Sequence, residues 1–117
     1  MRFAMLICGN EDEWNAQGMT DGPDPMAEIW AFIEKWEKAG KIVDRGAELE
    51  SVTKSKTIRP TGGGGRVVTD GPYLELKEVV GGVMFLNTAD IDEAVAIASE
   101  WPLAGSGSIE VRPVIEH

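Results

Sequence analysis

The side chains best suited to chemistry lie at and just after an Asp-Gly-Pro corner. Four ionisable groups fall within nine residues there: Asp70, Glu75, Lys77 and Glu78. Gly71 accepts a positive φ and Pro72 fixes its own φ, so the corner is stiff enough to aim its neighbours. Asp70 or Glu78 could act as a general base, Lys77 could hold an anionic substrate or intermediate, and Glu75 could contribute to ligand binding. This pattern predicts a polar site at the corner.

The same residues also fit an ordinary surface loop. Asp70 would then bond turn amides, while Lys77 and Glu78 would pair at the surface. An exposed ion pair contributes only ~0–1 kcal/mol, so stability alone is a weak reason to keep all four groups. Both interpretations stay open at this point.

Four further side chains are candidates for ligand binding. Arg59 and Arg112 lie on or beside predicted strands and could each bind a carboxylate or phosphate through two N–H groups. Alternatively, each pairs with a neighbour such as Glu110, or lies at a dimer interface. Trp14 and Tyr73 lie beside predicted loops and could line the mouth of a pocket. Anchoring those loops is an equally open role for both rings.

Other patterns in the sequence carry no site. The run Gly62–Gly65 lacks the Lys-Ser/Thr pair and the following helix of a phosphate-binding loop, so we expect the tip of a hairpin. Cys8 and the terminal His117 cannot form a zinc site, and the acidic segment near the N-terminus lacks EF-hand spacing. Cys8 lies in an apolar run and is expected to pack rather than to act as a nucleophile. We therefore expect no metal and no cofactor.

Length and charge limit the classes of function. The 117 residues fit one domain spanning 1–117, and 20 Asp and Glu against 11 Lys and Arg give a net charge of −9. Such a balance is common in soluble proteins and repels phosphate backbones, which argues against nucleic acid as a partner. The single cysteine excludes an internal disulfide, and no apolar run approaches the ~20 residues of a membrane helix. We expect a soluble cytoplasmic protein that does not act at a membrane.

Two helices can be placed from apolar spacing and capping residues. Asp24 and Pro25 predict a helix start, and Gly40 its end. Its apolar stripe comprises Met26, Ile29, Trp30, Ile33 and Trp36, of which Trp30 and Trp36 are predicted core residues. A second helix is predicted from Asp90, which with Glu93 resembles a capping box, to just before Pro102. Its apolar stripe comprises Ile91, Ala94, Val95 and Ala98.

The strands complete an α+β pattern. Apolar or alternating runs predict strands at 3–8, 42–49, 51–59, 66–69, 82–87 and 108–115, and 11–24 reads as a long loop with at most one helical turn. The resulting order, β-α-β, hairpin, β-α-β, predicts a ferredoxin-like split β-α-β fold with both helices on one face of an antiparallel sheet. Apolar side chains such as Phe3, Met5 and Met84 would not be left facing water on the other face. We therefore expect a homodimer that packs sheet on sheet.

Several segments together resemble a known family. They are Val68-Thr69-Asp70-Gly71-Pro72-Tyr73, followed by Glu75 and Lys77-Glu78, then Gly81-Gly82, and then Asp92-Glu93-Ala94. This run resembles the YCII-related domain family, and most closely its DGPF branch. The opening residues 3–7 and the closing residues 107–114 fit the branch too, so the resemblance covers nearly the whole chain.

The resemblance implies a ferredoxin-like fold and a dimeric α+β barrel assembly in a bacterial cytoplasmic protein. Genes of this branch often lie beside those of extracytoplasmic-function sigma factors, and the branch has no established reaction. Tyr73 stands where the branch usually has phenylalanine, and Leu76 where it usually has threonine. Some members of the wider family have a His–Asp pair proposed as catalytic. That pair cannot be carried over here, because the one histidine is the last residue.

These observations predict a homodimer with a small-molecule site at the dimer cleft, which binds or transforms a compact polar metabolite. The alternative is a non-catalytic interaction or regulatory module that acts on a protein such as an extracytoplasmic-function sigma factor.

Overall fold

The computed structural model describes residues 1–17, 25–72, 78–103 and 107–117. Its elements, in chain order, are β1 (Arg2–Gly9), α1 (Glu11–Gln17), α2 (Pro25–Lys38), β2 (Ile42–Glu48), the 3₁₀ turn η1 (Val52–Lys54), β3 (Lys56–Pro60), β4 (Arg66–Asp70), β5 (Val79–Asn87), α3 (Ile91–Ala98) and β6 (Ser108–Pro113).

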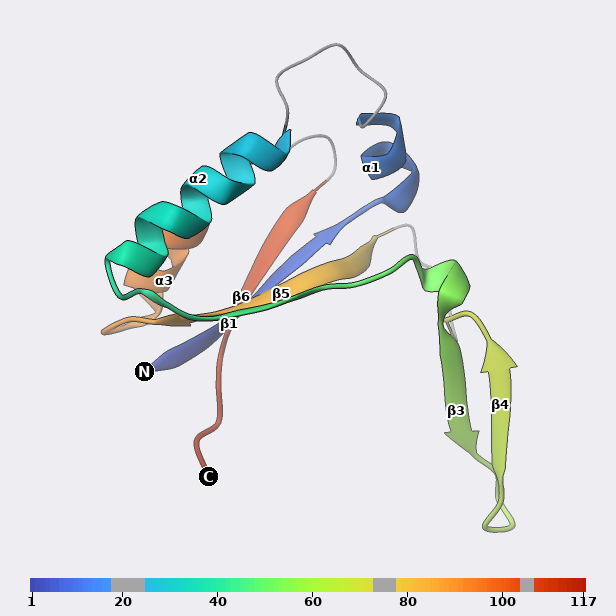
Figure 1. The fold of residues 1–117 in the computed structure, drawn as a ribbon. Coiled ribbons are helices and arrows are strands. Elements are labelled where there is room, and N and C mark those ends of the chain that lie inside the picture. The colour runs from blue at the N-terminus through green and yellow to red at the C-terminus, as the bar shows by residue number, and fades with distance from the viewer. Residues whose placement is uncertain (18–24, 73–77, 104–106) are drawn as a thin grey trace.

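Four strands form the main sheet, in the order β2-β5-β1-β6, and every neighbouring pair is antiparallel. Helices α2 and α3 cover one face of this sheet (Figure 1). Strands β3 and β4 form a separate two-stranded sheet. The strand order and the β-α-β repeats on either side of a hairpin confirm the predicted ferredoxin-like α+β fold.

The core lies between the sheet and the two helices. Alternate residues of β1 and β5 point toward the helices, and the innermost are Phe3, Met5, Met84 and Leu86, each at most 4% exposed. Phe3, Met5 and Met84 were expected to need cover from a second copy. That reasoning was wrong, because α2 and α3 of the same chain already bury them.

Helix α2 buries a different arc from the one predicted. Ile29, Phe32, Ile33 and Trp36 belong to the core or pack against it, whereas Trp30 is 53% exposed. At ~100° per residue, Trp30 lies about 100° round the helix from Ile29, outside the arc that faces the sheet. The prediction of Trp30 as a core residue was therefore wrong. Trp36 is half-buried at the margin of the core.

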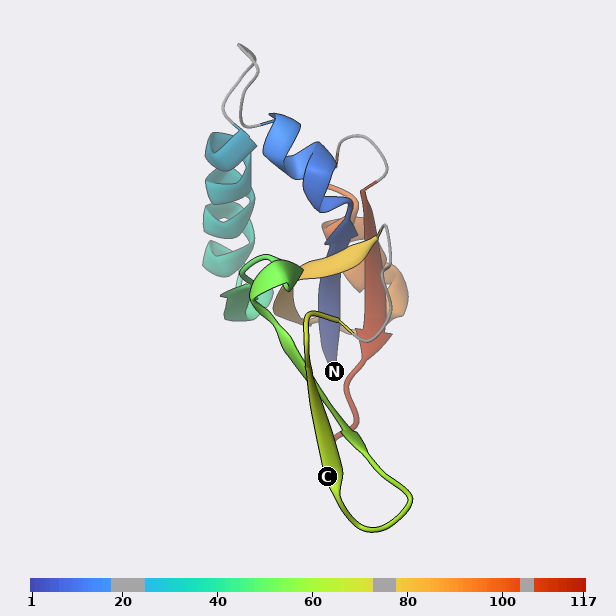
Figure 2. The same cartoon turned by 90° about the vertical axis from the view of Figure 1, so that its right-hand side faces the viewer.

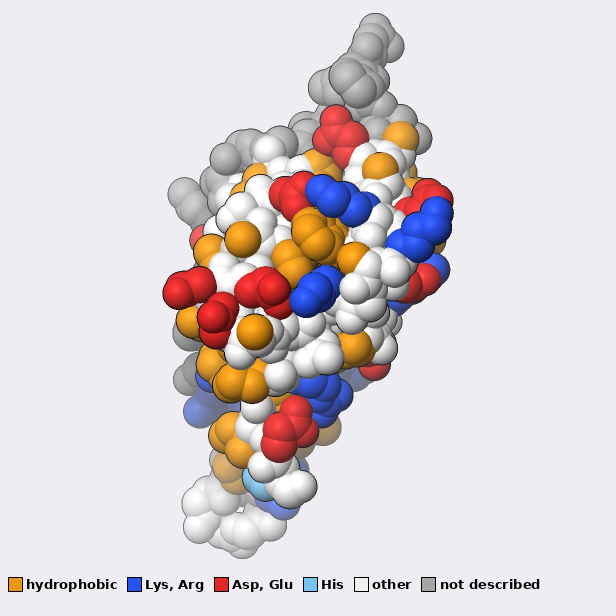
Figure 3. Space-filling view, turned by 90° about the vertical axis from the view of Figure 1, so that its left-hand side faces the viewer, with side chains coloured by type: hydrophobic (Ala, Val, Ile, Leu, Met, Phe, Trp, Pro, Cys, Tyr) orange, Lys and Arg blue, Asp and Glu red, His pale blue; other side chains and the backbone are white. Residues whose placement is uncertain are grey.

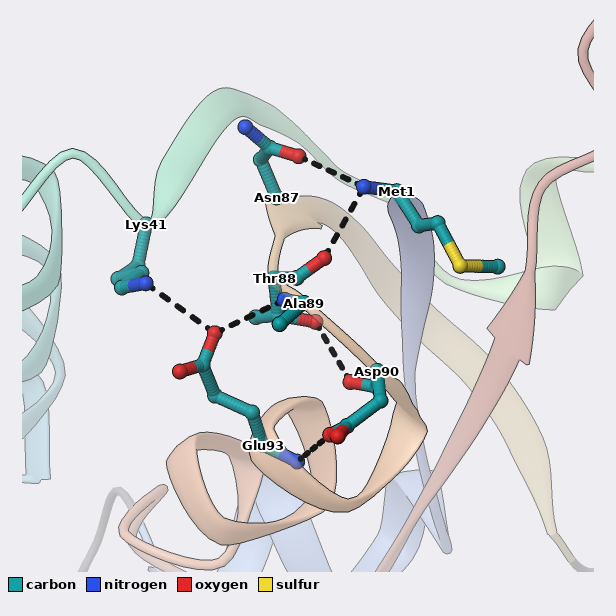
Figure 4. Close-up of polar contacts among 7 residues, drawn as sticks. All are labelled: Met1, Lys41, Asn87, Thr88, Ala89, Asp90 and Glu93. Carbon is teal, nitrogen blue, oxygen red and sulfur yellow. Dashed lines mark hydrogen bonds and ion pairs between the residues drawn. The ribbon is translucent and has the colours of Figure 1, made fainter.

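Helix α3 begins at the predicted capping box (Figure 4). The Glu93 backbone N–H donates to Asp90 Oδ1 at 2.9 Å, and the Glu93 carboxylate accepts from the backbone N–H of Ala89 at 3.1 Å. Lys41, at the entry to β2, also donates to Glu93 Oε1 at 3.1 Å, so the cap ties the helix to the sheet.

The buried stripe of α3 is narrower than predicted. It consists of Ala94, Ile97 and Ala98, whereas Ile91 and Val95 are 42% and 46% exposed. Ile97 was missed, and two members of the predicted stripe face solvent, because the arc that rests on the sheet runs through Ala94, Ile97 and Ala98 at three- and four-residue steps.

Helix α1 replaces the first half of the loop predicted for 11–24. Asn10 caps it, since Asn10 Oδ1 accepts from the backbone N–H groups of Asp12 at 2.9 Å and Glu13 at 3.3 Å. Gly9 ends β1, and Asn10 follows it directly as the cap of α1. Residues 18–24 lie outside the described part of the chain.

Residues 56–70 form an arm, the β3–β4 hairpin, which projects away from the helix layer (Figures 1 and 2). The Gly-rich segment lies at its tip as predicted: the Thr61 N–H donates to the Gly65 carbonyl at 2.9 Å, and Gly64 adopts φ +87°. The strand predicted over 51–59 divides into η1 and β3. None of the helices in the described ranges is long and apolar enough to cross a membrane.

Candidate functional site

Asp70 ends β4 at the base of the arm. Its side chain is 88% exposed and accepts a hydrogen bond from Lys56 Nζ at 2.5 Å, directly across the β3–β4 pair. The Asp-Gly-Pro corner follows directly. It is fixed to the start of β3, because the Gly71 N–H donates to the Ser55 carbonyl at 2.8 Å, and Gly71 adopts φ +83°. Asp70 thus has a cross-strand lysine as its partner, a pairing that neither interpretation of the sequence included.

Glu78 lies just before β5 and has a different partner. The Ser108 hydroxyl, at the first residue of β6, donates to Glu78 Oε1. The partners of Asp70 and Glu78 therefore come from separate sheets. Tyr73, Glu75 and Lys77 lie outside the described residues, so a shared site around the corner stays a prediction.

The structure groups four polar side chains that the sequence does not bring together. Cys8, Glu78, Ser108 and Glu110, here called the polar edge, lie at the β1–β6 side of the main sheet. Cys8 is directly opposite Ser108, and Glu110 is opposite Leu6, two pairs further along and therefore on the same face. Partial burial and the nearby charges of Glu78 and Glu110 all raise the pKa of the Cys8 thiol. A protonated thiol is a poor nucleophile, in line with the packing role predicted for this cysteine.

Beside the polar edge lies the sheet face that the helices leave uncovered, here called the open face. Its apolar members are Ala4, Leu6, Val83 and Phe85, which the β1–β5 register places in two directly opposed pairs. All four are half-buried although α2 and α3 lie on the other side of the sheet. A polar group bordered by an apolar floor is the usual make-up of a small-molecule site.

The two candidate arginines lie on different sheets. Arg112 lies on β6, opposite Ala4 of β1. Its Nε is 3.8 Å from Glu110 Oε2, and both side chains are more than half exposed. This is the neighbour pairing that we considered as the alternative to ligand binding. Arg59 lies on the arm, where it is exposed and pairs in register with Val67. The structure thus brings Arg112, but not Arg59, to the main sheet.

Trp14 anchors α1 onto the strands. A Cβ built on Gly9 would lie 2.5 Å from Trp14 Cζ2, and one on Gly81 would lie 2.6 Å from Trp14 Cη2. The indole therefore rests on the bare backbone of two neighbouring strands, where a side chain larger than glycine's hydrogen would collide with it. Of the two roles considered for Trp14, these contacts describe the anchoring one. A role of Trp14 in ligand binding stays a prediction.

Comparison with known proteins adds the family. The model of the YCII-related domain matches residues 1–117. The chain belongs to the YCII-related domain family. An uncharacterised protein of Rhizobium meliloti (strain 1021) is 32% identical over 116 residues, which cover 97% of this chain and 92% of that protein.

Two shallow hollows of this YCII-related domain lie along α2. One, of about 430 Å³, is lined by Trp30, Ile33, Glu34, Glu37, Lys38 and Arg45. The other, of about 320 Å³, is lined by Glu28, Ala31, Phe32, Lys35, Trp36, Glu100 and Pro102. Neither lining includes a predicted site residue from the described ranges.

The helix-covered side is a surface of paired charges. Figure 3 shows this side, where hydrophobic side chains lie among charges of both signs. Arg45 donates to both carboxylate oxygens of Glu37, at 2.6 and 2.8 Å, and this bonding lowers the pKa of Glu37. Lys35 pairs with Glu100 at 2.6 Å. In the described part of the chain, no three His, Cys, Asp or Glu side chains cluster as metal ligands would.

Proposed function

We propose that this YCII-related domain is a bacterial cytoplasmic homodimer that binds a compact polar metabolite on its open face, between the polar edge and the Asp-Gly-Pro corner. The observation that carries the proposal is the open face itself. One layer of helices covers one side of the sheet, and the apolar residues of the other side border four polar groups. The DGPF-type corner would place further ionisable groups at the same end of β5.

The open face supports a dimer for a physical reason. Leu6, Val83 and Phe85 lie centrally in a sheet of four strands, and Val80, next along β5, is 41% exposed. Such a contiguous apolar surface favours association, and a two-fold axis lets the same face of both copies cover each other. The apolar floor would then lie at the centre of the interface, with the polar edge at its margin.

The chemistry of the site would depend on carboxylates and an amine. Ser108 orients the Glu78 carboxylate, which leaves its remaining lone pairs for a ligand or for a proton. Asp70 is the other candidate base, and Lys77 the candidate group for holding an anion. We propose these roles for all three residues, with Glu75, Tyr73, Arg59, Arg112 and Trp14 as the candidate ligand contacts.

The dimer is tested by sedimentation equilibrium of the wild type and of Val83→Asp. We expect a wild-type dimer and a largely monomeric variant, because the substitution puts a charge in the middle of the open face. Val95→Asp is the control, since it makes the same substitution at a valine that is 46% exposed on the helix side. A monomeric wild type, or equal effects of the two variants, would end the proposal.

The ligand is tested by a thermal-shift screen of polar metabolites against the wild type, Lys77→Ala and Glu78→Gln. A compound that raises the wild-type melting temperature and fails on both variants would locate the site at the corner. Lys38→Ala removes a lysine from the end of α2 and should keep the response. If no metabolite of a broad library binds, the metabolite site is refuted.

One observation favours a second function, a non-catalytic regulatory module. Asp70 is 88% exposed at the base of the arm, outside both hollows, and the chain carries a net charge of −9. A protein with this net negative charge would suit a basic segment of a protein such as an extracytoplasmic-function sigma factor, with the exposed Asp70 as one contact. Titration calorimetry with such a purified factor should then give binding that Asp70→Asn weakens and added salt abolishes. Unchanged affinity of that variant would exclude this role for Asp70.

A further inference from the structure

The arm carries apolar side chains on one face that its own protomer does not cover. Ile58 and Val68 are directly opposed and are 64% and 57% exposed. The next pair on the same face, toward the tip, is Pro60 and Arg66. An isolated two-stranded hairpin is only marginally stable in water, so an apolar arm face of this kind gains most from a partner surface.

The position of the arm suggests what that surface is. In Figures 1 and 2 the arm extends from the sheet away from the layer of α2 and α3. A second copy that covers the open face would therefore lie on the side to which the arm extends. Under a two-fold axis each copy would meet the arm of the other, and the contact would occur twice.

Charge also favours this contact. The arm has three Lys or Arg and one Asp, a net charge of +2, so that the total of −9 leaves −11 on the rest of the chain. Lys56 is paired with Asp70 at the base of the arm, whereas Arg66 lies near the tip on the apolar face. The polar edge offers Glu78 and Glu110 as complementary groups. The acidic body of another copy should therefore attract the basic arm.

We propose that the arm of each protomer lies across the partner's open face and brings Arg66 to the partner's polar edge. The inference rests on the proposed homodimer and deepens it, because each metabolite site is then incomplete without the second copy. One protomer supplies Glu78 and Glu110, and the other supplies a guanidinium group. Such a site could bind a small polar ligand that carries both signs of charge, since the carboxylates would face its cationic group and the guanidinium its anionic group.

The two faces of the arm provide a matched pair of variants. Val68→Asp alters the face proposed to dock, and Val67→Asp alters the opposite face, where Val67 is 44% exposed. By sedimentation equilibrium we expect Val68→Asp to raise the dimer dissociation constant at least about tenfold, and Val67→Asp to change it less than about threefold. Equal effects of the two variants, with a wild-type dimer present, would overturn the arm contact and leave the open-face dimer intact.

The docking point is tested with a pair of introduced thiols in a Cys8→Ser background, because the raised pKa of Cys8 makes that thiol a slow target for maleimides. Glu110 is an exposed member of the polar edge, so the thiol introduced by Arg66→Cys should be joined to that of Glu110→Cys on the partner by a short bismaleimide linker. We expect covalent dimers on a denaturing gel, and their loss when Glu110→Cys is omitted. Arg59→Cys, on the other face of the arm, should form far fewer.

The outcomes separate the two proposals. A dimer that Val83→Asp dissociates, but in which Arg66→Cys links no better than Arg59→Cys, would refute the arm placement alone. A monomeric wild type would refute the homodimer and the arm contact together. Covalent dimers that persist without Glu110→Cys would show that the two arms meet each other rather than the polar edge, which also overturns the inference.

Discussion

Gly81→Ala tests whether the indole of Trp14 is held against the sheet. The new Cβ would lie 2.6 Å from both Cη2 and Cζ3 of the ring, whereas carbon atoms normally approach to about 3.5 Å. The ring would have to move by about 1 Å or the strand would have to shift. Overpacking of this kind costs about 1–3 kcal/mol, and we expect the free energy of unfolding to fall by that amount.

A double-mutant cycle isolates the contact. Once Trp14→Ala has removed the ring, Gly81→Ala should be neutral or stabilising by about 0.4–1 kcal/mol, because alanine restricts the unfolded chain more than glycine does. The φ of Gly81 is not positive, so alanine is tolerated by the backbone. Urea unfolding followed by far-ultraviolet circular dichroism measures all four proteins without relying on indole fluorescence.

Gly62→Ala is the control, since a Cβ there would meet no described atom within 4 Å. It should change the unfolding free energy by no more than about 0.5 kcal/mol. If Gly81→Ala costs the same with and without Trp14, the ring does not rest on this glycine. The account of Trp14 as the anchor of α1 would then fail.

Three further outcomes follow from the same structure. Asp90→Ala removes the cap of α3 and should lower the unfolding free energy by about 1 kcal/mol in urea titrations. Leu86→Ala leaves a cavity in the core and should lower the unfolding free energy by about 2–5 kcal/mol. Leu103→Ala, at a residue that is 49% exposed, should lower it by about 0.5 kcal/mol or less; similar losses for the two variants would contradict the placement of Leu86 in the core. The hydrogen bond from Lys41 lowers the pKa of Glu93, so the ionised carboxylate stabilises the fold above its unfolded pKa of about 4.3, and this stabilisation is lost as the pH falls through the lowered pKa. Glu93→Gln should therefore melt below the wild type at about pH 7, and the difference should shrink as falling pH protonates the Glu93 carboxylate in the folded protein; a constant difference would contradict the assignment.

Local signals were sufficient for most elements. The cap formed by Asp90 and Glu93, the Gly-rich tip and the alternating strand predicted over 108–115 each depend on residues close in the chain. The structure has all three, the last as β6, which ends at Pro113. Helix α1 shows the limit of such signals. Asn10 follows a strand and caps a helix. The sequence showed only the end of the strand, because the helix depends on the contact of Trp14 with two strands.

The candidate site was less predictable, since it depends on register. Alternation placed Glu110 and Arg112 on one side of their strand, but it could not say that Ser108 would lie opposite Cys8 and within reach of Glu78. Such neighbours are set by pairing between strands that are about a hundred residues apart in the chain. The roles of Lys77 and its neighbours remain predictions from the corner motif.

The sequence by itself determined the succession of strands and helices, the stiff Asp-Gly-Pro corner, the net charge and the membership of the family. Tertiary structure decided which arc of each helix is buried, and so why Trp30 and Val95 face solvent while Phe32 and Ile97 do not. It also decided which side of the sheet stays open. The reason is physical: propensity and capping act between near neighbours, whereas burial depends on surfaces that meet only after the chain has folded.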